Sequence, residues 1–347
     1  ANMGLIWCQS KALGCPQFVR WGFASSRAYG KLAAELKELS GIDTGYAPTG
    51  GIIPCLGEAE LEARAQFIEK LRAETEDGTY PASVLSRKEL EGMLPKVPFG
   101  PEVSGGIWSD MDGYVDPLHL MFAFRKSFVR LGGTLFAGER VSEVKPSGKG
   151  YAVVCGGRTL ECGKAVLAAG LGVRKLAAQL GTDIPVFPNK SQVMLLERIP
   201  ADVLPIPLLG IARTFGGTVM IGAAHENMGM DRRLTPEVLA ANAQWAVRVW
   251  PELERKRILR FWTGLRVWPK DAYPIYDRIP GHENAFVFAM HSAVSLAAIL
   301  EQALPDYVMG KPLPPDGAIF GLSRFAGGGS GFQGSAASSP HAEAPNK

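Results

Sequence analysis

Residues 261–300 read FWTGLRVWPKDAYPIYDRIPGHENAFVFAMHSAVSLAAIL, and they predict three consecutive pieces of structure. The first is a strand at 262–266 that carries a single arginine, Arg266. A proline-containing excursion follows, and an apolar strand at 285–289 then runs directly into a helix of small residues at 293–304. A strand that turns tightly into a helix directs backbone N–H groups and the positive helix end toward an electron-rich ligand. The alternative is an ordinary strand–helix junction in an α/β core.

Two residues in this stretch have competing interpretations. Ser292 precedes the helix and can serve as its N-cap, because a side-chain oxygen there can accept a first-turn N–H. Arg266 can bind an anionic ligand, or it can form a structural ion pair with a nearby carboxylate. The acidic residues available for such a pair are Asp271, Asp277 and Glu283.

The composition excludes several classes of function. The chain has 347 residues, of which 46% are hydrophobic, with a formal net charge of +3, which is typical of a globular protein. No Lys/Arg run with interleaved aromatic residues occurs, so we expect no nucleic-acid partner. No apolar run approaches the roughly 18 residues that span a bilayer. The five cysteines are odd in number and form no C-x-x-C pair, so we expect no metal site. We expect the thiols to be reduced, in a cytoplasmic protein.

The order of segments predicts two discontinuous domains. Helix–strand segments with small residues occupy 116–181 and 285–310, and strand-rich segments lie between them. We expect the first long helix to start at a cap formed by residues 25–26 and to end near Leu39. Residues 326–347 form a Gly/Ser/Ala/Pro tail that cannot bury enough apolar surface to fold, so we expect this tail to be disordered.

An ordered series of motifs carries a resemblance to a known family. Asp112-Gly113-Tyr114-Val115-Asp116-Pro117 opens a helix that ends at Gly132-Gly133, Val141-Ser142-Glu143-Val144 follows, and the next buried strand ends in Ala168-Ala169-Gly170. With the later Gly264-Leu265-Arg266 and His291-Ser292, this order resembles the D-amino-acid oxidase, glycine oxidase and sarcosine oxidase superfamily of FAD-dependent oxidoreductases. The segment HSAVSLAA at 291–298 is most similar to the flavoprotein subunits of hydrogen cyanide synthase, opine oxidase and D-hydroxyproline dehydrogenase. The resemblance covers residues 1–325.

The resemblance implies an α/β fold with two domains. One is a Rossmann-like, three-layer FAD-binding domain, and the other is a discontinuous substrate domain built on an antiparallel or mixed β-sheet. We expect the FAD-binding domain to comprise residues 1–45, 105–184 and 260–322. The substrate domain then comprises residues 46–104 and 185–259.

The chain departs from the family pattern at its first residues and near His291. The family begins with a βαβ unit whose G-x-G-x-x-G turn holds the FAD pyrophosphate, and no such motif begins this sequence. Residues 1–7 instead resemble the loop that follows that unit and lies against the flavin ring. We therefore expect the first βαβ unit to be missing, either through truncation or because it forms a separate, retained piece. Met290 stands where the family has a glycine before the histidine, and Ala293 and Val294 stand where the family has glycines after the serine.

The resemblance also assigns roles to individual residues. Arg266 corresponds to the arginine that binds the substrate carboxylate, and its planar fork suits two charge-assisted bonds. His291 would face the flavin or the substrate, or it is a core histidine satisfied by a neighbour. The expected cofactor-binding residues lie in five separate segments, and they are Asn2, Met3, Gly4, Val141, Ala168, Ala169, Gly170, Gly264, Ser292, Ala293, Val294 and Ser295. His225, Tyr273, Trp268 and Trp262 are candidates for the walls of the substrate pocket.

These assignments imply FAD-dependent oxidation of an amino acid or secondary amine by hydride transfer to flavin. No cysteine occurs within 261–300, so we expect non-covalent FAD. The similar flavoproteins work as subunits, so we expect a hetero-oligomer whose partner carries an iron–sulfur cluster or flavin. We expect a cytoplasmic protein, or one peripheral to the inner membrane through that partner, with membrane association left open. The alternatives are a non-catalytic flavoprotein-like scaffold subunit and a nicotinamide-dependent dehydrogenase, for which no fingerprint is visible.

Overall fold

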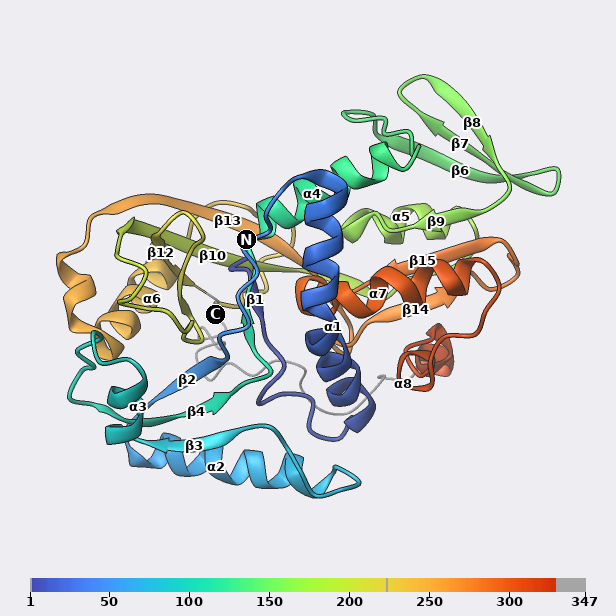
Figure 1. The fold of residues 1–347 in the computed structure, drawn as a ribbon. Coiled ribbons are helices and arrows are strands. Elements are labelled where there is room, and N and C mark those ends of the chain that lie inside the picture. The colour runs from blue at the N-terminus through green and yellow to red at the C-terminus, as the bar shows by residue number, and fades with distance from the viewer. Residues whose placement is uncertain (1, 223, 329–347) are drawn as a thin grey trace.

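A three-stranded sheet forms the centre of one half of the protein. The computed structural model describes residues 2–222 and 224–328 (Figure 1). Strand β15 (Ala285–Ala289) pairs antiparallel with β14 (Ile275–Arg278) and parallel with β9 (Ala165–Leu167). All five residues of β15 are buried, as expected for a strand covered on both faces.

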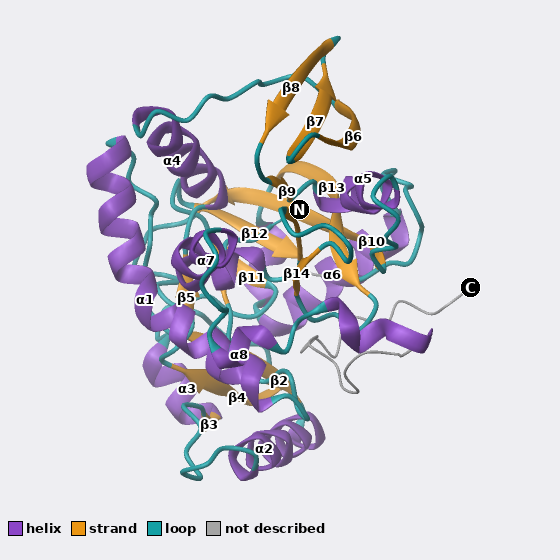
Figure 2. Ribbon diagram, turned by 90° about the vertical axis from the view of Figure 1, so that its right-hand side faces the viewer, coloured by secondary structure: helices purple, strands orange, loops and turns teal. Residues whose placement is uncertain are grey.

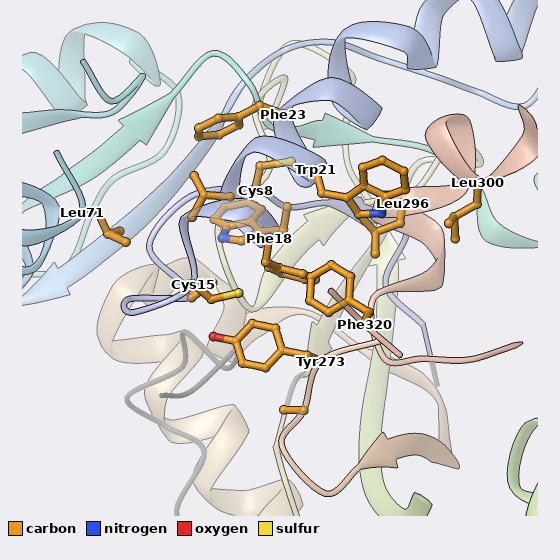
Figure 3. Packing of buried hydrophobic residues seen from close by; sticks show 14 of the residues in the cluster. Cys8, Cys15, Phe18, Trp21, Phe23, Leu71, Tyr273, Leu296, Leu300 and Phe320 are labelled. Atoms are coloured by element: carbon orange, nitrogen blue, oxygen red, sulfur yellow. The ribbon is translucent and has the colours of Figure 1, made fainter. Parts of the chain in front are cut away.

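Helices cover one face of this sheet. Helix α1 (Pro16–Ser40) packs against α7 (Ala293–Val308), which follows β15, and against α4 (Pro117–Arg130). Figure 3 shows Phe18 and Trp21 of α1 together with Leu296 of α7 and with Phe320, which follows α8 (Pro315–Ala318). The phenyl ring of Phe18 meets the Tyr273 ring edge-on, with centroids 5.2 Å apart.

The opposite face of the sheet carries a second β layer and a short helix. Strands β6 (Val141–Ser147), β7 (Gly150–Cys155) and β8 (Arg158–Cys162) form an antiparallel sheet, and η1 (Gly170–Gly172) leads into α5 (Val173–Ala178). Val287 of β15 belongs to the buried cluster on this side, whereas its neighbours Phe286 and Phe288 belong to the α1 side. This alternation follows from the two-residue period of a strand, and it confirms the predicted three layers.

A second, larger sheet forms the other half of the molecule (Figure 2). Its main strands run in the order β11 (Ile211–Arg213), β12 (Thr218–Gly222), β10 (Val186–Arg198) and β13 (Ile258–Pro269). Single bridges from Leu208 to Ile52 and Ile211 join these strands to β2 (Gly51–Leu56). Strand β2 pairs with β4 (Val103–Ser109), which pairs in turn with β3 (Ser83–Ser86). The helical segments beside them are α2 (Glu58–Ala73), α3 (Arg87–Met93), α6 (Pro236–Val249) and η2 (Pro251–Arg255).

Strand β13 belongs to the large sheet and then leads to the small one through residues 270–274. It pairs along β10 from Val186↔Pro269 to Leu196↔Ile258, so the domain boundary predicted at residue 260 falls near its start. The two-stranded ribbon of β1 (Leu5–Ile6) and β5 (Gly113–Tyr114) lies beside α7. The division into two domains stays a prediction.

The first long helix is longer at its N-terminal end than the sequence predicted. Helix α1 begins at Pro16 rather than at the predicted cap of residues 25–26, because Phe18 and Trp21 are already on its buried face. Ser25 is buried, and its hydroxyl accepts a hydrogen bond from Ile299 N of α7 instead of capping a helix. At the other end of the chain, residues 329–347 of the predicted tail lie outside the described residues, and residues 326–328 end η3 (Leu322–Gly328).

Candidate flavin and substrate site

Arg266 lies in the middle of β13, opposite Asn189 of β10. Its Nη2 donates to Ser191 Oγ at 2.7 Å, and its Nη1 lies 3.1 Å from Ala224 O and 3.3 Å from Asn189 Oδ1. Because strand side chains alternate, Asn189 and Ser191 share one face of the sheet with Arg266. Burial lowers the pKa of Arg266 to about 10, so the guanidinium stays charged at neutral pH.

His225 is a further neighbour of the Arg266 guanidinium. Its Nδ1 lies 2.9 Å from Arg266 Nη1 and 2.9 Å from Asn189 Oδ1. Burial, and then the charge of Arg266, lower the pKa of His225 to about 3. The imidazole is therefore neutral near pH 7 and adds no charge to the site.

The positive charge of Arg266 is not compensated by protein carboxylates. Within residues 2–222 and 224–328, no carboxylate lies within the 4.0 Å salt-bridge distance of the Arg266 guanidinium. Asp271, one of the predicted alternative partners, instead binds Arg324, with Nε and Oδ2 2.8 Å apart. A partly buried cation surrounded by neutral groups is prepared to bind an anion from outside the protein.

Aromatic rings connect Arg266 to the turn before α7. The Trp268 ring lies 5.1 Å from the His225 ring and 4.5 Å from the His291 ring, measured between centroids. Burial, followed by the charges of Arg266 and Lys11, holds the pKa of His291 well below its usual value. Arg266 and His291 thus lie in one polar and aromatic group, with both imidazoles neutral.

The start of α7 is exposed and lacks a side-chain cap. Ser292 occupies the N-cap position, but it adopts a left-handed conformation with φ 58°. Its hydroxyl lies 3.0 Å from His291 Nδ1 and makes no capping hydrogen bond, so the predicted capping role was wrong. Ala293 is exposed. The first-turn N–H groups of α7 therefore remain available to a ligand.

The N-terminal segment runs along the first turn of α7. Ser295 Oγ accepts a hydrogen bond from Trp7 N at 3.0 Å and lies 3.3 Å from Leu5 O. Asn2 Oδ1 accepts a hydrogen bond from Gly4 N at 2.7 Å, and this position requires glycine because its φ is 75° and a side chain would collide with Val115 O. Met3 packs in one buried cluster with Val193 and Trp262, which share the face of the sheet that carries Arg266.

Ala168, Ala169 and Gly170 follow β9 at the same edge of the small sheet from which α7 begins. Strands β9 and β15 are parallel, so their carboxyl ends lie side by side. Ala168 and Ala169 are exposed, and Gly170 has a φ of 57°. Ligands of parallel α/β sheets bind at the carboxyl ends of the strands. Val141 lies elsewhere, at the start of β6, where it is half-buried and pairs with Cys155.

The features at this edge fit the predicted FAD. They combine uncapped helix N–H groups with exposed small residues that let a flat ligand approach the backbone. Trp7 Nε1 and Ser10 Oγ, in the segment that passes the start of α7, are buried without a hydrogen-bond partner among the described residues. Gly264, buried in β13 two residues before Arg266, adds no side chain to the face that carries Arg266.

The assignment of site residues from sequence missed Asn189, Ser191 and Ala224. The signal for two of them was present, because Asn189-Lys190-Ser191-Gln192 is a polar run between the apolar segments 186–188 and 193–196 of one strand. In the part of the chain that the structure describes, no group of three or more His, Cys, Asp or Glu side chains could hold a metal ion. None of the helices described there is long and apolar enough to cross a membrane.

The chain is similar to known flavoproteins along most of its length. It is 32% identical to an opine oxidase subunit from Rhizobium meliloti over 326 residues, which cover 94% of this chain and 87% of that protein. It is 28% identical to hydrogen cyanide synthase subunit HcnC of Pseudomonas aeruginosa, covering 89% of this chain and 75% of that protein. The crystal structure of glycine oxidase from Geobacillus kaustophilus superimposes with a TM-score of 0.85 at 24% identity, covering 94% of this chain and 88% of that structure.

The match to a protein family agrees with these relatives. The family described as "FAD dependent oxidoreductase" matches residues 1–300, which include the α7 turn and all segments that surround Arg266. Together with the fold, this match identifies the chain as a member of the family of FAD-dependent oxidoreductases, with FAD as its cofactor.

Proposed function

We propose that this protein oxidises an amino acid or secondary amine that carries a carboxylate, with Arg266 as the carboxylate-binding residue. The observation that carries the proposal is the guanidinium of Arg266, which is partly buried and whose partners within residues 2–222 and 224–328 are all neutral. Bound FAD supplies the acceptor for the hydride that leaves the carbon next to nitrogen. The substrate C–N bond becomes C=N in the same step.

The residues around Arg266 orient the substrate. Ser191 contacts Nη2 of the guanidinium and His225 contacts Nη1, and these contacts fix the position of a fork that can present two N–H groups to a carboxylate. Because the pKa values of His225 and His291 are lowered, both imidazoles are neutral and add no charge to that of Arg266. A cationic pocket also favours the neutral amine over the ammonium form, and only the neutral amine has the lone pair that assists hydride loss.

The FAD-binding residues are a further part of the proposal. We assign the isoalloxazine ring to the space bounded by Asn2, Met3 and Gly4 and by the first turn of α7, from Ser292 to Ser295. Ala168, Ala169 and Gly170 would lie against the ribose and pyrophosphate, and Val141 would lie at the adenine end. These assignments, non-covalent attachment, and the role of Gly264 beside the ring are parts of the proposal.

The names of the relatives support a place in a larger assembly. The opine oxidase and hydrogen cyanide synthase relatives are both named as subunits of those enzymes. We infer that this chain is the catalytic flavoprotein subunit of a hetero-oligomeric dehydrogenase, with an iron–sulfur or flavin partner. The second candidate is a non-catalytic scaffold subunit, for which we expect a stable complex that shows no flavin absorbance.

The test compares Arg266→Met with Arg260→Met, which removes an exposed arginine from the same strand. Candidate substrates are glycine, D-hydroxyproline, an opine and an N-methyl amino acid, each beside the matching amine without its carboxylate. Loss of two charge-assisted hydrogen bonds should raise KM for the carboxylate substrate at least about 100-fold in Arg266→Met. FAD content, measured by absorbance, should stay unchanged.

The amine without a carboxylate sharpens this test. This amine should bind wild type and Arg266→Met equally weakly, because it has no carboxylate to contact the guanidinium in either protein. Arg260→Met should behave as wild type toward both compounds. If Arg266→Met loses FAD but keeps its affinity for the carboxylate substrate, Arg266 is structural and the proposal is wrong.

A further inference from the structure

A second polar cluster lies on the opposite face of the sheet strand that contributes to the Arg266 site. In β10, Lys190 and Gln192 alternate with Asn189 and Ser191, so they point to the other side of the sheet. The Lys190 side chain is only 1% exposed, and its Nζ lies 3.1 Å from Oε2 of Glu226, which is 5% exposed. A buried ion pair is thus separated from Arg266 by the thickness of one strand.

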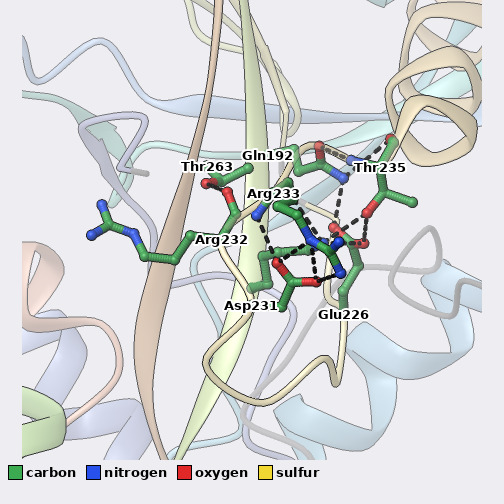
Figure 4. A network of polar contacts seen from close by, with 8 residues as sticks. Gln192, Glu226, Asp231, Arg232, Arg233, Thr235 and Thr263 are labelled. Atoms are coloured by element: carbon green, nitrogen blue, oxygen red, sulfur yellow. Dashed lines mark hydrogen bonds and ion pairs between the residues drawn. The ribbon is translucent and has the colours of Figure 1, made fainter.

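Every charged atom of this pair has further partners. Figure 4 shows the carboxylate of Glu226 between Gln192 and Thr235. Gln192 Nε2 and Thr235 Oγ1 each donate to a different carboxylate oxygen at 2.7 Å, and Lys190 Nζ donates to Thr235 Oγ1 at 2.7 Å and to Arg233 O at 3.2 Å. Gln192 Oε1 accepts from Thr235 N at 2.9 Å. The network therefore fastens both ends of the 226–235 loop.

The backbone connects this network to the substrate site. Lys190 and Glu226 form an antiparallel bridge, with N–H···O distances of 2.9 and 3.0 Å in the two directions. Since successive side chains alternate, His225 points to the face that carries Asn189 and Arg266 while Glu226 points to Lys190. The position of His225 beside Arg266 therefore depends on the register of residue 226 against β10.

We propose that Lys190 is a positioning residue for substrate binding, because it holds the Glu226 carboxylate on the far face of the sheet. A slip of one residue would exchange the two faces and bring Glu226 beside Arg266 in place of His225. An ion pair between them would neutralise the charge that binds the substrate carboxylate. This inference rests on the proposed function of Arg266.

An apolar pair at positions 190 and 226 would serve stability equally well. Desolvation offsets most of the attraction in a buried ion pair, and such pairs are often replaced by hydrophobic residues without loss of stability. Their directional bonds, however, accept only one register. A role in register, rather than in stability, therefore accounts for a charged pair at this place.

The test measures binding of benzoate, a carboxylate with no oxidisable C–N bond, by isothermal titration calorimetry on the FAD-loaded protein. Lys190→Met should raise the benzoate Kd at least about tenfold, because the freed Glu226 competes for Arg266. The double variant Lys190→Met/Glu226→Leu should return to within about threefold of wild type, because the competitor is gone. The control Arg248→Met, which breaks the exposed Arg248–Glu102 pair, should leave the Kd unchanged.

Two outcomes would overturn the inference: Lys190→Met binding benzoate as wild type does, or the double variant binding it as weakly as Lys190→Met. If Lys190→Met does not fold, Thr235→Val decides, since it removes only the hydroxyl between Lys190 and Glu226. Its Kd should rise about threefold to tenfold, and an unchanged Kd would refute the role of the network. Arg266→Met, titrated in parallel, distinguishes a failure of the proposed function from a failure of the positioning role of Lys190. If Arg266→Met binds benzoate as wild type does, the proposed function itself is wrong.

Discussion

Two arginines withdrawn from solvent, Arg266 and Arg324, have opposite surroundings. Arg324 is 9% exposed and binds the fully buried carboxylate of Asp271, with Nε 2.8 Å from Oδ2. It also donates to Pro274 O at 2.7 Å and to Gly321 O at 2.8 Å. Arg266 has a serine, a histidine, an amide and a carbonyl as partners, and no carboxylate among the described residues.

The difference separates a structural arginine from the one that we propose binds a ligand. The Arg324–Asp271 pair ties η3 to the 269–274 excursion, and its charge is cancelled inside the protein. The described residues place no carboxylate on Arg266, so a cation is partly buried without an anion. Under the proposed function, the same planar group is a cross-link in one place and binds a carboxylate ligand in the other.

Removal of Arg324 is expected to have the largest effect. Arg324→Met would remove the Arg324 partner of the buried Asp271 carboxylate, and breaking a buried ion pair in this way costs about 3–5 kcal/mol of stability. Chemical denaturation should show this loss, while KM of the remaining folded protein stays near that of wild type. Arg324→Met/Asp271→Leu should recover most of the stability, and a double variant as unstable as the single one would contradict the ion-pair explanation.

Exchange of Arg266 for lysine is expected to have an intermediate effect. Arg266→Lys keeps the charge but loses the fork, so one charge-assisted hydrogen bond to the substrate is lost. A hydrogen bond to a charged group contributes about 1.5–3 kcal/mol, so its loss should raise KM for a carboxylate substrate about 10- to 100-fold. The melting temperature should change little, in contrast to Arg324→Met. A large loss of stability with unchanged KM would place Arg266 in the same class as Arg324.

The sequence predicted the features that depend on local pattern. The apolar strand β15, the small-residue start of α7 and the single arginine of β13 were all readable from residues 261–300. Capping was misread at α1 and α7, because the Ser25–Ser26 pair and Ser292 have the right residue type but use their hydroxyls elsewhere. Ser25 bonds α7 and Ser292 contacts His291, and these contacts depend on tertiary packing.

The neutral partners of Arg266 required information that local pattern does not contain. Asn189 and Ser191 meet Arg266 only through the pairing of β10 with β13, and they are more than 70 residues from it in the sequence. The polar run at 189–192 indicated an unusual strand, but its division into one face for Arg266 and one for Glu226 depends on register. Residue type and the family resemblance therefore made Arg266 the candidate anion-binding residue and left its surroundings open.

Lowering the pH should produce the smallest of the three effects on the protein, and this effect arises from His225. Its pKa in the folded protein is about 3, against about 6.5 in the unfolded chain. The folded pKa is depressed, so between these values the unfolded state binds the proton that the folded state does not. His225 therefore stabilises nothing above pH 6.5, and below it stability falls by at most about 1.4 kcal/mol per pH unit.

Denaturation at pH 7.5, 6.0 and 5.0 tests this slope. His225→Gln should flatten the fall in stability below pH 6.5 relative to wild type. Arg266→Met should flatten it less, because the charge of Arg266 is the second cause of the low pKa and burial is the first. Arg324→Met should keep the wild-type slope, since Arg324 does not contribute to the pKa of His225. Equal slopes in wild type and His225→Gln would show that His225 is protonated in the folded protein, and the Arg266 pocket would then hold two cations instead of one.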